Sequence, residues 1–173
     1  MRILILNGSP RKQGTVASLL RQVMKGLQGD NEVEWIDVCD LNMQNCAACM
    51  KCRSEYACVL PEDDAHIVGR KIANADALII GTPVHWGNMC APLKSLLDRN
   101  VHVFMDESPR GIPIPLQKGK RAALVTACTT PWPLNFLLPE SRGALRAVKE
   151  VLHYRGSKKV GSVVKPGTKK STQ

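Results

Sequence analysis

The sequence predicts an α/β fold in three layers: a doubly wound parallel sheet of five strands, in the order 2-1-3-4-5, with helices on both faces. Two observations support this prediction. Five short apolar runs alternate with segments whose apolar residues recur at helical spacing. The first run, RILIL at 2–6, is continuously apolar after Arg2, as a strand covered on both faces requires.

The expected strands occupy residues 2–6, 33–38, 77–81, 121–128 and 158–164. The first helix is expected to end at Gly29 and to bury Leu19, Leu20, Val23, Met24 and Leu27. A second helix, capped by Asp63 and Asp64, is expected to run to about Asn74 and to bury Ile67, Val68 and Ile72. A third helix is expected to carry Leu93, Leu96, Leu97 and Val101, and the last one Leu145, Val148 and Leu152.

The length and composition predict one domain of an ordinary globular kind. At 173 residues, 44% of them hydrophobic and 23% charged, the chain is long enough to bury a sizeable core. We expect a single domain over residues 1–165, with a cysteine-rich loop inserted at 39–62 and a frayed, polar, basic tail at 166–173. No apolar run approaches the roughly 20 residues of a membrane span. No membrane association is therefore expected, and the N-terminal apolar stretch is too short for an export signal, which favours a reducing cytoplasm.

The net charge of +9 is unevenly distributed. Residues 1–108 contain 11 Lys and Arg against 13 Asp and Glu, whereas residues 109–173 contain 13 against 2. Aromatic residues make up only 4% of the chain and do not alternate with basic ones, so nucleic-acid binding is not expected. The basic half is either a solvated face or a surface for an anionic cofactor or an acidic protein.

In this strand order a ligand binds where the order reverses, at the carboxyl ends of strands 1 and 3. The loop after strand 1, NGSPRKQGT at 7–15, leads into a helix. It offers the Ser9 and Thr15 hydroxyls, the Arg11 guanidinium and the backbone N–H groups of a helix N-terminus, all of which suit a phosphate. A simple turn with glycine as punctuation is the alternative.

The loop after strand 3, within TPVHWGNMCAPLKSLLDR at 82–99, is rich in flat and small residues. Such residues suit a planar ring because they form flat walls and allow close approach of the backbone. A loop with a packed Trp86 is the alternative.

Together with CAACMKCRSEYAC at 46–58, these two stretches resemble the flavodoxin-like NAD(P)H-dependent FMN reductases, particularly the branch of iron–sulfur flavoproteins. The resemblance implies FMN, NAD(P)H as co-substrate, and a homodimer or homotetramer. It implies that the FMN phosphate lies in the loop at 9–16 and the ring against residues 83–88. The implied FMN-binding residues are Ser9, Arg11, Gly14, Thr15, Val16, Pro83, Val84, His85, Trp86, Gly87 and Asn88.

The chain departs from this family at three places. Thr15-Val16 stands where an Asn-Thr pair is usual, so one phosphate-bonding hydroxyl is lost, at a cost of about 1–3 kcal/mol. His85 stands where a Tyr is usual, and Cys90 where a Ser is usual. We interpret His85 as a packing substitution rather than a titratable group at the flavin.

The remaining question is the role of Cys46, Cys49, Cys52 and Cys58. Their C-x2-C-x2-C-x5-C spacing lacks the dozen or more residues that usually separate two zinc-binding pairs. It differs from the ferredoxin run in having a more distant fourth cysteine that no proline follows. A [4Fe–4S] cluster, free thiols at a subunit contact, and zinc or disulfides remain open. Cys39, Cys90 and Cys128 are expected to be small buried residues.

The sequence therefore predicts an enzyme that passes electrons from NAD(P)H through FMN to a small-molecule acceptor such as a quinone, a free flavin or a nitroaromatic. No catalytic acid–base pair is visible. The alternative is an electron carrier with FMN and a [4Fe–4S] cluster. It would dock a ferredoxin-type partner on Arg142, Arg146 and Lys149, which lie on one face of the last helix.

Overall fold

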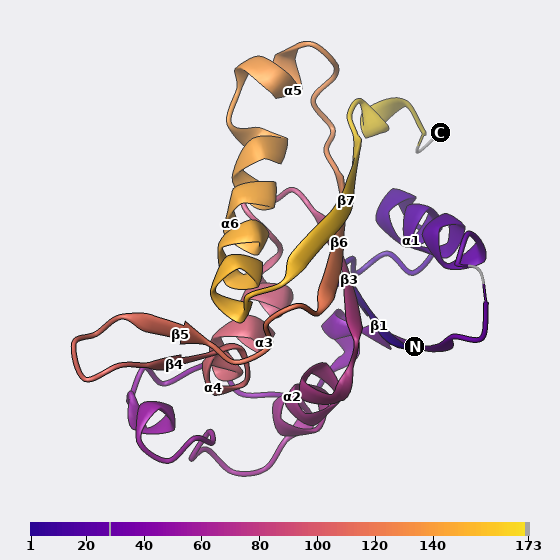
Figure 1. Cartoon of the computed structure of the whole chain (residues 1–173). Coiled ribbons are helices and arrows are strands. Elements are labelled where there is room, and N and C mark those ends of the chain that lie inside the picture. Colours follow the sequence, from indigo (N-terminus) through magenta and orange to yellow (C-terminus); the bar gives the residue numbers. More distant parts are fainter. Residues whose placement is uncertain (28, 172–173) are drawn as a thin grey trace.

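The computed structural model describes residues 1–27 and 29–171. Its main sheet has five parallel strands in the order β2-β1-β3-β6-β7, which confirms the predicted order (Figure 1). The strands are β1 (Arg2–Asn7), β2 (Glu32–Asp37), β3 (Ala77–Pro83), β6 (Arg121–Ala127) and β7 (Lys158–Lys165). The order reverses between β1 and β3, and in this class of fold ligands bind at the carboxyl ends of the strands at such a reversal.

The long helices cover the two faces of the sheet unequally. On one face lies α1 (Thr15–Lys25), and on the other lie α2 (Asp64–Asn74), α3 (Ala91–Arg99) and α6 (Glu140–Arg155) (Figure 1). Among the described residues, none of the helices is long and apolar enough to cross a membrane.

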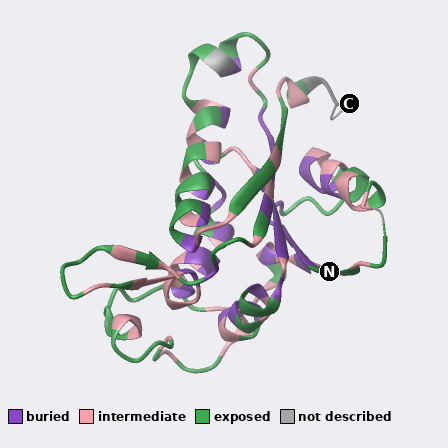
Figure 2. Cartoon of the chain, in the orientation of Figure 1, coloured by how far each residue is buried: buried purple, intermediate pink, exposed green. Residues whose placement is uncertain are grey.

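The core forms on both sides of β1. Leu4 and Leu6 face the cluster beneath α2, α3 and α6, while Ile3 and Ile5 face the cluster beneath α1. Complete burial of such a side chain stabilises the fold by roughly 1.5–3 kcal/mol. The buried residues therefore concentrate along the central strands and the inner faces of the helices (Figure 2).

Several shorter elements lie outside this core. An antiparallel hairpin that the sequence analysis did not predict projects from the domain, formed by β4 (Met105–Glu107) and β5 (Pro113–Pro115). The short helices are α4 (Val101–Phe104) and α5 (Leu134–Leu137), with 3-10 turns η1 (Val38–Asp40), η2 (Lys51–Arg53) and η3 (Thr168–Ser171).

Several expected boundaries were wrong. Helix α1 ends at Lys25 and is closed by Gly26, because the first glycine that the chain reaches is a poor helix former. The second strand lies one residue earlier than expected, at Glu32–Asp37. Helix α3 stops at Arg99, so Val101 begins α4 instead of continuing the same helix.

One expected burial was also wrong. Ile67 is 42% exposed, because α2 turns Ala65, Val68 and Ile72 inward instead. In the tail at 166–173, Gly167 N donates to Thr130 O at 3.0 Å and Thr168 N donates to Cys128 O at 3.1 Å. Residues 172–173 lie outside the described residues.

Gly81 of β3 lies where α1 packs closely against the sheet. A Cβ at this position would lie 2.5 Å from Leu20 Cδ1 and 2.9 Å from Val16 Cγ1. Gly81→Ala is therefore expected to overpack the α1 interface and to lower the free energy of unfolding by about 1–3 kcal/mol in urea titrations. Gly161→Ala in β7 is the matched control, because its new Cβ would meet nothing within 4 Å. Equal losses in both variants would contradict the tight α1–β3 contact.

Candidate functional site

The loop after β1 is organised from its first residue. Asn7, which is buried, donates from Nδ2 to Asp37 Oδ1 at 2.7 Å and accepts Ser9 N on Oδ1 at 3.1 Å. Ser9 Oγ in turn accepts Arg11 N at 3.2 Å, and Gly14 N donates to Arg11 O at 2.9 Å. The chain therefore forms a compact loop between β1 and α1, which the hydrogen bond from Arg11 N to the Ser9 hydroxyl stabilises. Ser9 was among the site residues expected from the sequence, whereas Asn7 was not.

The N-terminus of α1 follows this loop. Its N-cap, Gly14, makes no side-chain capping bond, and no acidic residue lies in the first turn. The first N–H groups of the helix are therefore suited to an anion. Arg11 is exposed beside these N–H groups, and Thr15 is half-buried. The side chain of Val16 is apolar and packs under the helix, so Val16 can offer an anion only its backbone N–H.

The loop after β3 forms a tight reverse turn. His85 and Asn88 exchange two backbone hydrogen bonds of 2.9 Å, and Trp86 and Gly87 between them have φ of 51° and 70°. Positive φ at both central residues defines a type I′ turn, which bulky residues adopt at a cost. Pro83 and Val84 lead into this turn, and Val84 N donates to Ala127 O at 3.1 Å.

This turn presents Trp86 to solvent with its side chain fully exposed, so the expected alternative of a packed Trp was wrong. The turn rests on α6, because a Cβ on Gly143 would lie only 2.0 Å from Gly87 O. Before α6 the segment PWPLNFLLP at 131–139 carries α5 outward from the domain. It exposes Trp132, Leu134, Leu137 and Leu138. The sequence analysis missed this apolar segment, although its density of large apolar residues between prolines was a visible signal.

Backbone contacts tie the two loops together. Gly8 N donates to Gly81 O at 2.8 Å, and Cys90 Sγ donates back to Gly8 O at 2.8 Å. Cys90 N donates to Thr82 Oγ1 at 3.0 Å. The structure thus brings the 7–15 loop and the 82–90 loop together at the point where the strand order reverses, as predicted.

The isolated cysteines behave as small buried residues, with one exception in exposure. Cys90 and Cys128 are buried, whereas Cys39 is half-buried. Burial raises the pKa of Cys90 and of Cys128, and burial followed by the charge of Cys90 raises the pKa of Cys39 to about 11. All three therefore remain protonated at neutral pH. Cys90 keeps a donor toward Gly8 O where a serine is usual in the family.

The four remaining cysteines share one cavity of about 80 Å³, together with Arg99. Three residues of the loop, Ala48, Met50 and Tyr56, have φ of 51°, 60° and 53°. Non-glycine residues in this region are uncommon and are often found at functional sites. The backbone between the cysteines is therefore bent by left-handed residues, and the loop is not a relaxed coil.

Four thiols line this cavity, and four thiolates are the ligand set of a [4Fe–4S] cluster. Among the described residues no three His, Cys, Asp or Glu side chains lie close enough to hold one ion. A cube of four irons takes one thiolate at each iron, so its sulfur ligands are further apart than those of an ion. Burial raises the pKa of Cys52, Arg53 lowers it, and the other three thiols of the cavity raise it again.

A buried arginine connects this loop to the core. The side chain of Arg99, with no exposed surface, donates from Nη1 and Nη2 to Asp63 at 2.7 and 3.1 Å, from Nη1 to Gln44 O at 2.7 Å, and from Nε to Cys58 Sγ at 3.1 Å. Burial alone would raise the pKa of Asp63, but hydrogen bonds from Arg99, Gln44 N and His66 outweigh it and lower the pKa to about 2. His66 Nε2 also donates to Cys58 O at 3.1 Å.

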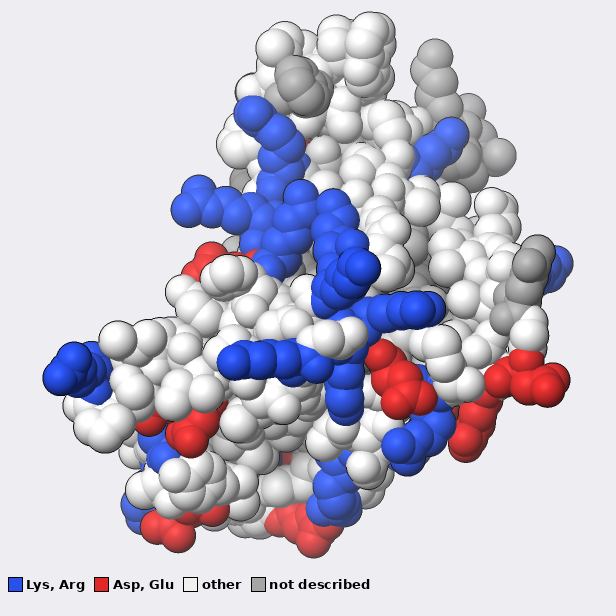
Figure 3. All heavy atoms as spheres, in the orientation of Figure 1, with Lys and Arg blue, Asp and Glu red and all other residues white. Residues whose placement is uncertain are grey.

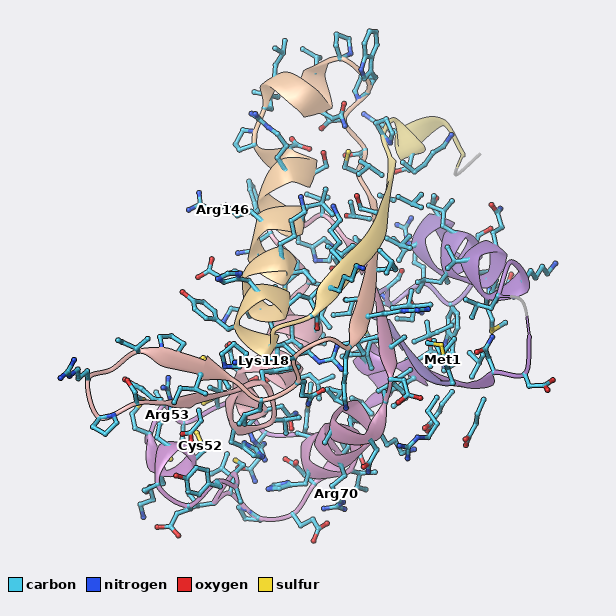
Figure 4. The ribbon with its side chains drawn as sticks, in the orientation of Figure 1. Met1, Cys52, Arg53, Arg70, Lys118 and Arg146 are labelled. Atoms are coloured by element: carbon cyan, nitrogen blue, oxygen red, sulfur yellow. The ribbon has the colours of Figure 1, made fainter. Side chains whose placement is uncertain are left out.

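The sequence analysis assigned Asp63 only as a helix cap and missed Arg99. The signal for Arg99 was its place on α3 close to the buried pair Leu96 and Leu97. Arg53 on the outer side of the loop forms an ion pair with Glu107 of the hairpin, and Figure 4 shows Cys52 and Arg53 beneath β4 and β5. Both anchors hold the loop against neighbouring elements.

Many cations of the basic half of the chain gather on one flank of the domain. Figure 3 shows Lys and Arg side chains gathered over α6 and β7. The exposed cations of this surface include Arg142, Arg146, Lys149, Lys158, Lys159 and Lys165. Strand β7 lies at the edge of the sheet and is exposed along most of its length, so these charges lie on an open flank.

The fold is flavodoxin-like, and an uncapped helix N-terminus lies beside an aromatic turn at the point where its strand order reverses. The chain belongs to the family of NADPH-dependent FMN reductases, which it matches over residues 1–131. This confirms the resemblance inferred from the sequence.

The chain is similar to curated iron–sulfur flavoproteins over about 100 residues. It is 33% identical over 101 residues to one from Methanocaldococcus jannaschii, covering 58% of this chain and 52% of the relative. It is 34% identical over 102 residues to one from Archaeoglobus fulgidus, covering 58% and 49%. The matches thus span about half the length of these relatives.

Solved structures share the fold over nearly the whole chain. Smu.1420 from Streptococcus mutans superposes with a TM-score of 0.78 at 23% identity, covering 98% of this chain and 89% of its own. An azoreductase from Bacillus anthracis superposes with a TM-score of 0.76 at 17% identity, covering 98% and 88%.

Proposed function

We propose that the protein is an FMN-dependent oxidoreductase that takes hydride from NAD(P)H and passes electrons to a small acceptor, such as a quinone, a free flavin or a nitroaromatic. The observation that carries the proposal is the contact between the two loops where the strand order reverses, in which Cys90 Sγ donates to Gly8 O at 2.8 Å. Membership of the reductase family supports the same conclusion.

In this proposal the residues present fit FMN. The Arg11 guanidinium, the Thr15 hydroxyl and the N–H groups of Thr15 and Val16 would hold the phosphate at the uncapped N-terminus of α1. The turn at 83–88, with its backbone groups and Trp86, would bound the ring. The bound flavin supplies hydride acceptance and electron release, and the protein supplies binding, orientation and a polar backbone environment.

We further propose that the protein acts as a homodimer or homotetramer. Trp86, Trp132 and Leu137 are exposed near the proposed flavin site, and exposed apolar groups of this size are characteristic of contact surfaces. A second copy that covers them would also exclude water from the flavin.

The proposed phosphate site is tested by Arg11→Ala. Because only FMN carries the phosphate, the loss of one charged hydrogen bond, worth about 1.5–3 kcal/mol, should weaken FMN roughly ten- to a hundredfold and leave riboflavin affinity unchanged. Isothermal titration calorimetry on the flavin-free protein measures both. Lys12→Ala is the matched control, since Lys12 is the next cation and pairs with Asp40 at 2.5 Å. Equal losses of FMN and riboflavin would place the phosphate elsewhere.

The proposed reductase activity is tested by anaerobic stopped-flow mixing of the FMN-loaded protein with NADPH or NADH. We expect the flavin absorbance to bleach, and faster with NADPH, because the second half of the chain is basic. Steady-state oxidation with a quinone should follow. If the flavin stays oxidised with both nucleotides but bleaches with reduced ferredoxin, the result would contradict the reductase function and favour the electron carrier.

A second candidate function is favoured by the cavity of four cysteines. In it the protein carries electrons between FMN and a [4Fe–4S] cluster held by Cys46, Cys49, Cys52 and Cys58. Helix α3 begins beside Cys90 at the flavin loop and ends at Arg99 on the cavity, so its nine residues span ~13 Å between the two sites. The basic face of α6, Arg142, Arg146 and Lys149, would dock an acidic ferredoxin-type partner.

Cys58→Ser tests this second function. Iron and acid-labile sulfide, measured on protein purified without oxygen, should approach four of each per chain in the wild type and fall sharply in the variant, while FMN content stays the same. Cys128→Ser, outside the cavity, is the matched control and should keep its iron. A wild type free of iron, with four titratable thiols in the loop, would leave the reductase function standing without the cluster.

A further inference from the structure

We propose that Arg99 is a positioning residue that raises the reduction potential of an iron–sulfur cluster at the four cysteines, and that Asp63 opposes it. The inference rests on the second proposed function. It concerns two side chains that are not among the proposed ligands and that no resemblance to the family assigned.

The first step is the geometry of the guanidinium. Arg99 lies at the end of α3 and Asp63 at the start of α2, and the two side chains meet as a two-pronged pair with contacts of 2.7 and 3.1 Å. This pairing fixes the plane of the guanidinium, because both planar groups must align. The remaining Nε–H then has one direction, and it points at Cys58 Sγ, 3.1 Å away.

The second step is the effect of that contact on a bound cluster. A cluster gains negative charge on reduction, and hydrogen bonds to its sulfur ligands stabilise the reduced form. Because Arg99 has no exposed side-chain surface, water screens its charge little. The other cation of the cavity, Arg53, is more exposed and is paired with Glu107, so its influence is weaker.

The third step is the opposite sign of Asp63. Its carboxylate keeps a negative charge at neutral pH, since its pKa is lowered to about 2. That charge destabilises the reduced cluster at the same time as it orients Arg99. Asn caps helices about as well as Asp, so Asp63→Asn removes the charge while keeping an oxygen for the N-terminus of α2.

The experiment is a redox titration of the cluster, followed by electron paramagnetic resonance, in anaerobically purified protein with FMN bound. Arg99→Met should lower the midpoint potential, and Arg99→Lys should lower it less, because Lys keeps the charge but lacks the fork. Asp63→Asn should raise it. Arg70→Met is the matched control, since Arg70 is an exposed cation of α2 paired with Glu62, and its potential should equal that of the wild type.

The outcomes separate the inference from the function on which it rests. A wild type without iron refutes the cluster itself, and with it this inference. A wild type with iron, but equal potentials in the wild type and in Arg99→Lys and Asp63→Asn, overturns the inference alone. If Arg99→Met loses its iron, the midpoint potential of Arg99→Lys distinguishes the two roles. A potential below that of the wild type supports the positioning role of Arg99. A potential equal to that of the wild type shows a purely structural role.

Discussion

The hydrogen bond from Gly8 N to Gly81 O, 2.8 Å long, joins the loop after β1 to β3, and the site depends on it. It forms because neither residue has a side chain: a Cβ on Gly8 would lie 2.8 Å from Cys90 Sγ, and one on Gly81 would enter the space of Leu20. Because Gly8 and Gly81 carry no side chains, α1, β3 and the loop before α3 can pack close together. The open N-terminus of α1 and the aromatic turn consequently lie at one edge of the sheet.

Backbone strain is concentrated where the chemistry is proposed. The four non-glycine residues with positive φ among the described ones are Ala48, Met50, Tyr56 and Trp86. Three bend the cysteine loop, and the fourth holds an aromatic ring in solvent beside the flavin loop. Such conformations persist only where surrounding contacts impose them. Arg99 and Arg53 supply those contacts for the cysteine loop. The turn that contains Trp86 packs closely against Gly143 of α6.

The domain is asymmetric in its covering and in its charge. Helix α1 covers one face of the sheet and contacts β1, β3 and β6, while β7 stays largely exposed at the edge. The cations of α6 and β7 lie on that flank (Figure 3). The proposed flavin site, the cysteine cavity and the basic flank are thus separate surfaces of one small domain, linked by α3 and α6.

The sequence alone determined the layers, the strand order, the two loops at the reversal and the four-cysteine motif. Apolar periodicity and helix-capping chemistry are local properties, and they predicted the five strands of the main sheet and the N-cap of α2 at Asp63. Contacts between distant residues were decided only by the tertiary structure. These include the pairing of Arg99 with Asp63 and Cys58, the brace at Asn7, and the exposure of Trp86 and Ile67. Each depends on which elements pack together, and a side chain's burial and partners are set by neighbours far away in the chain.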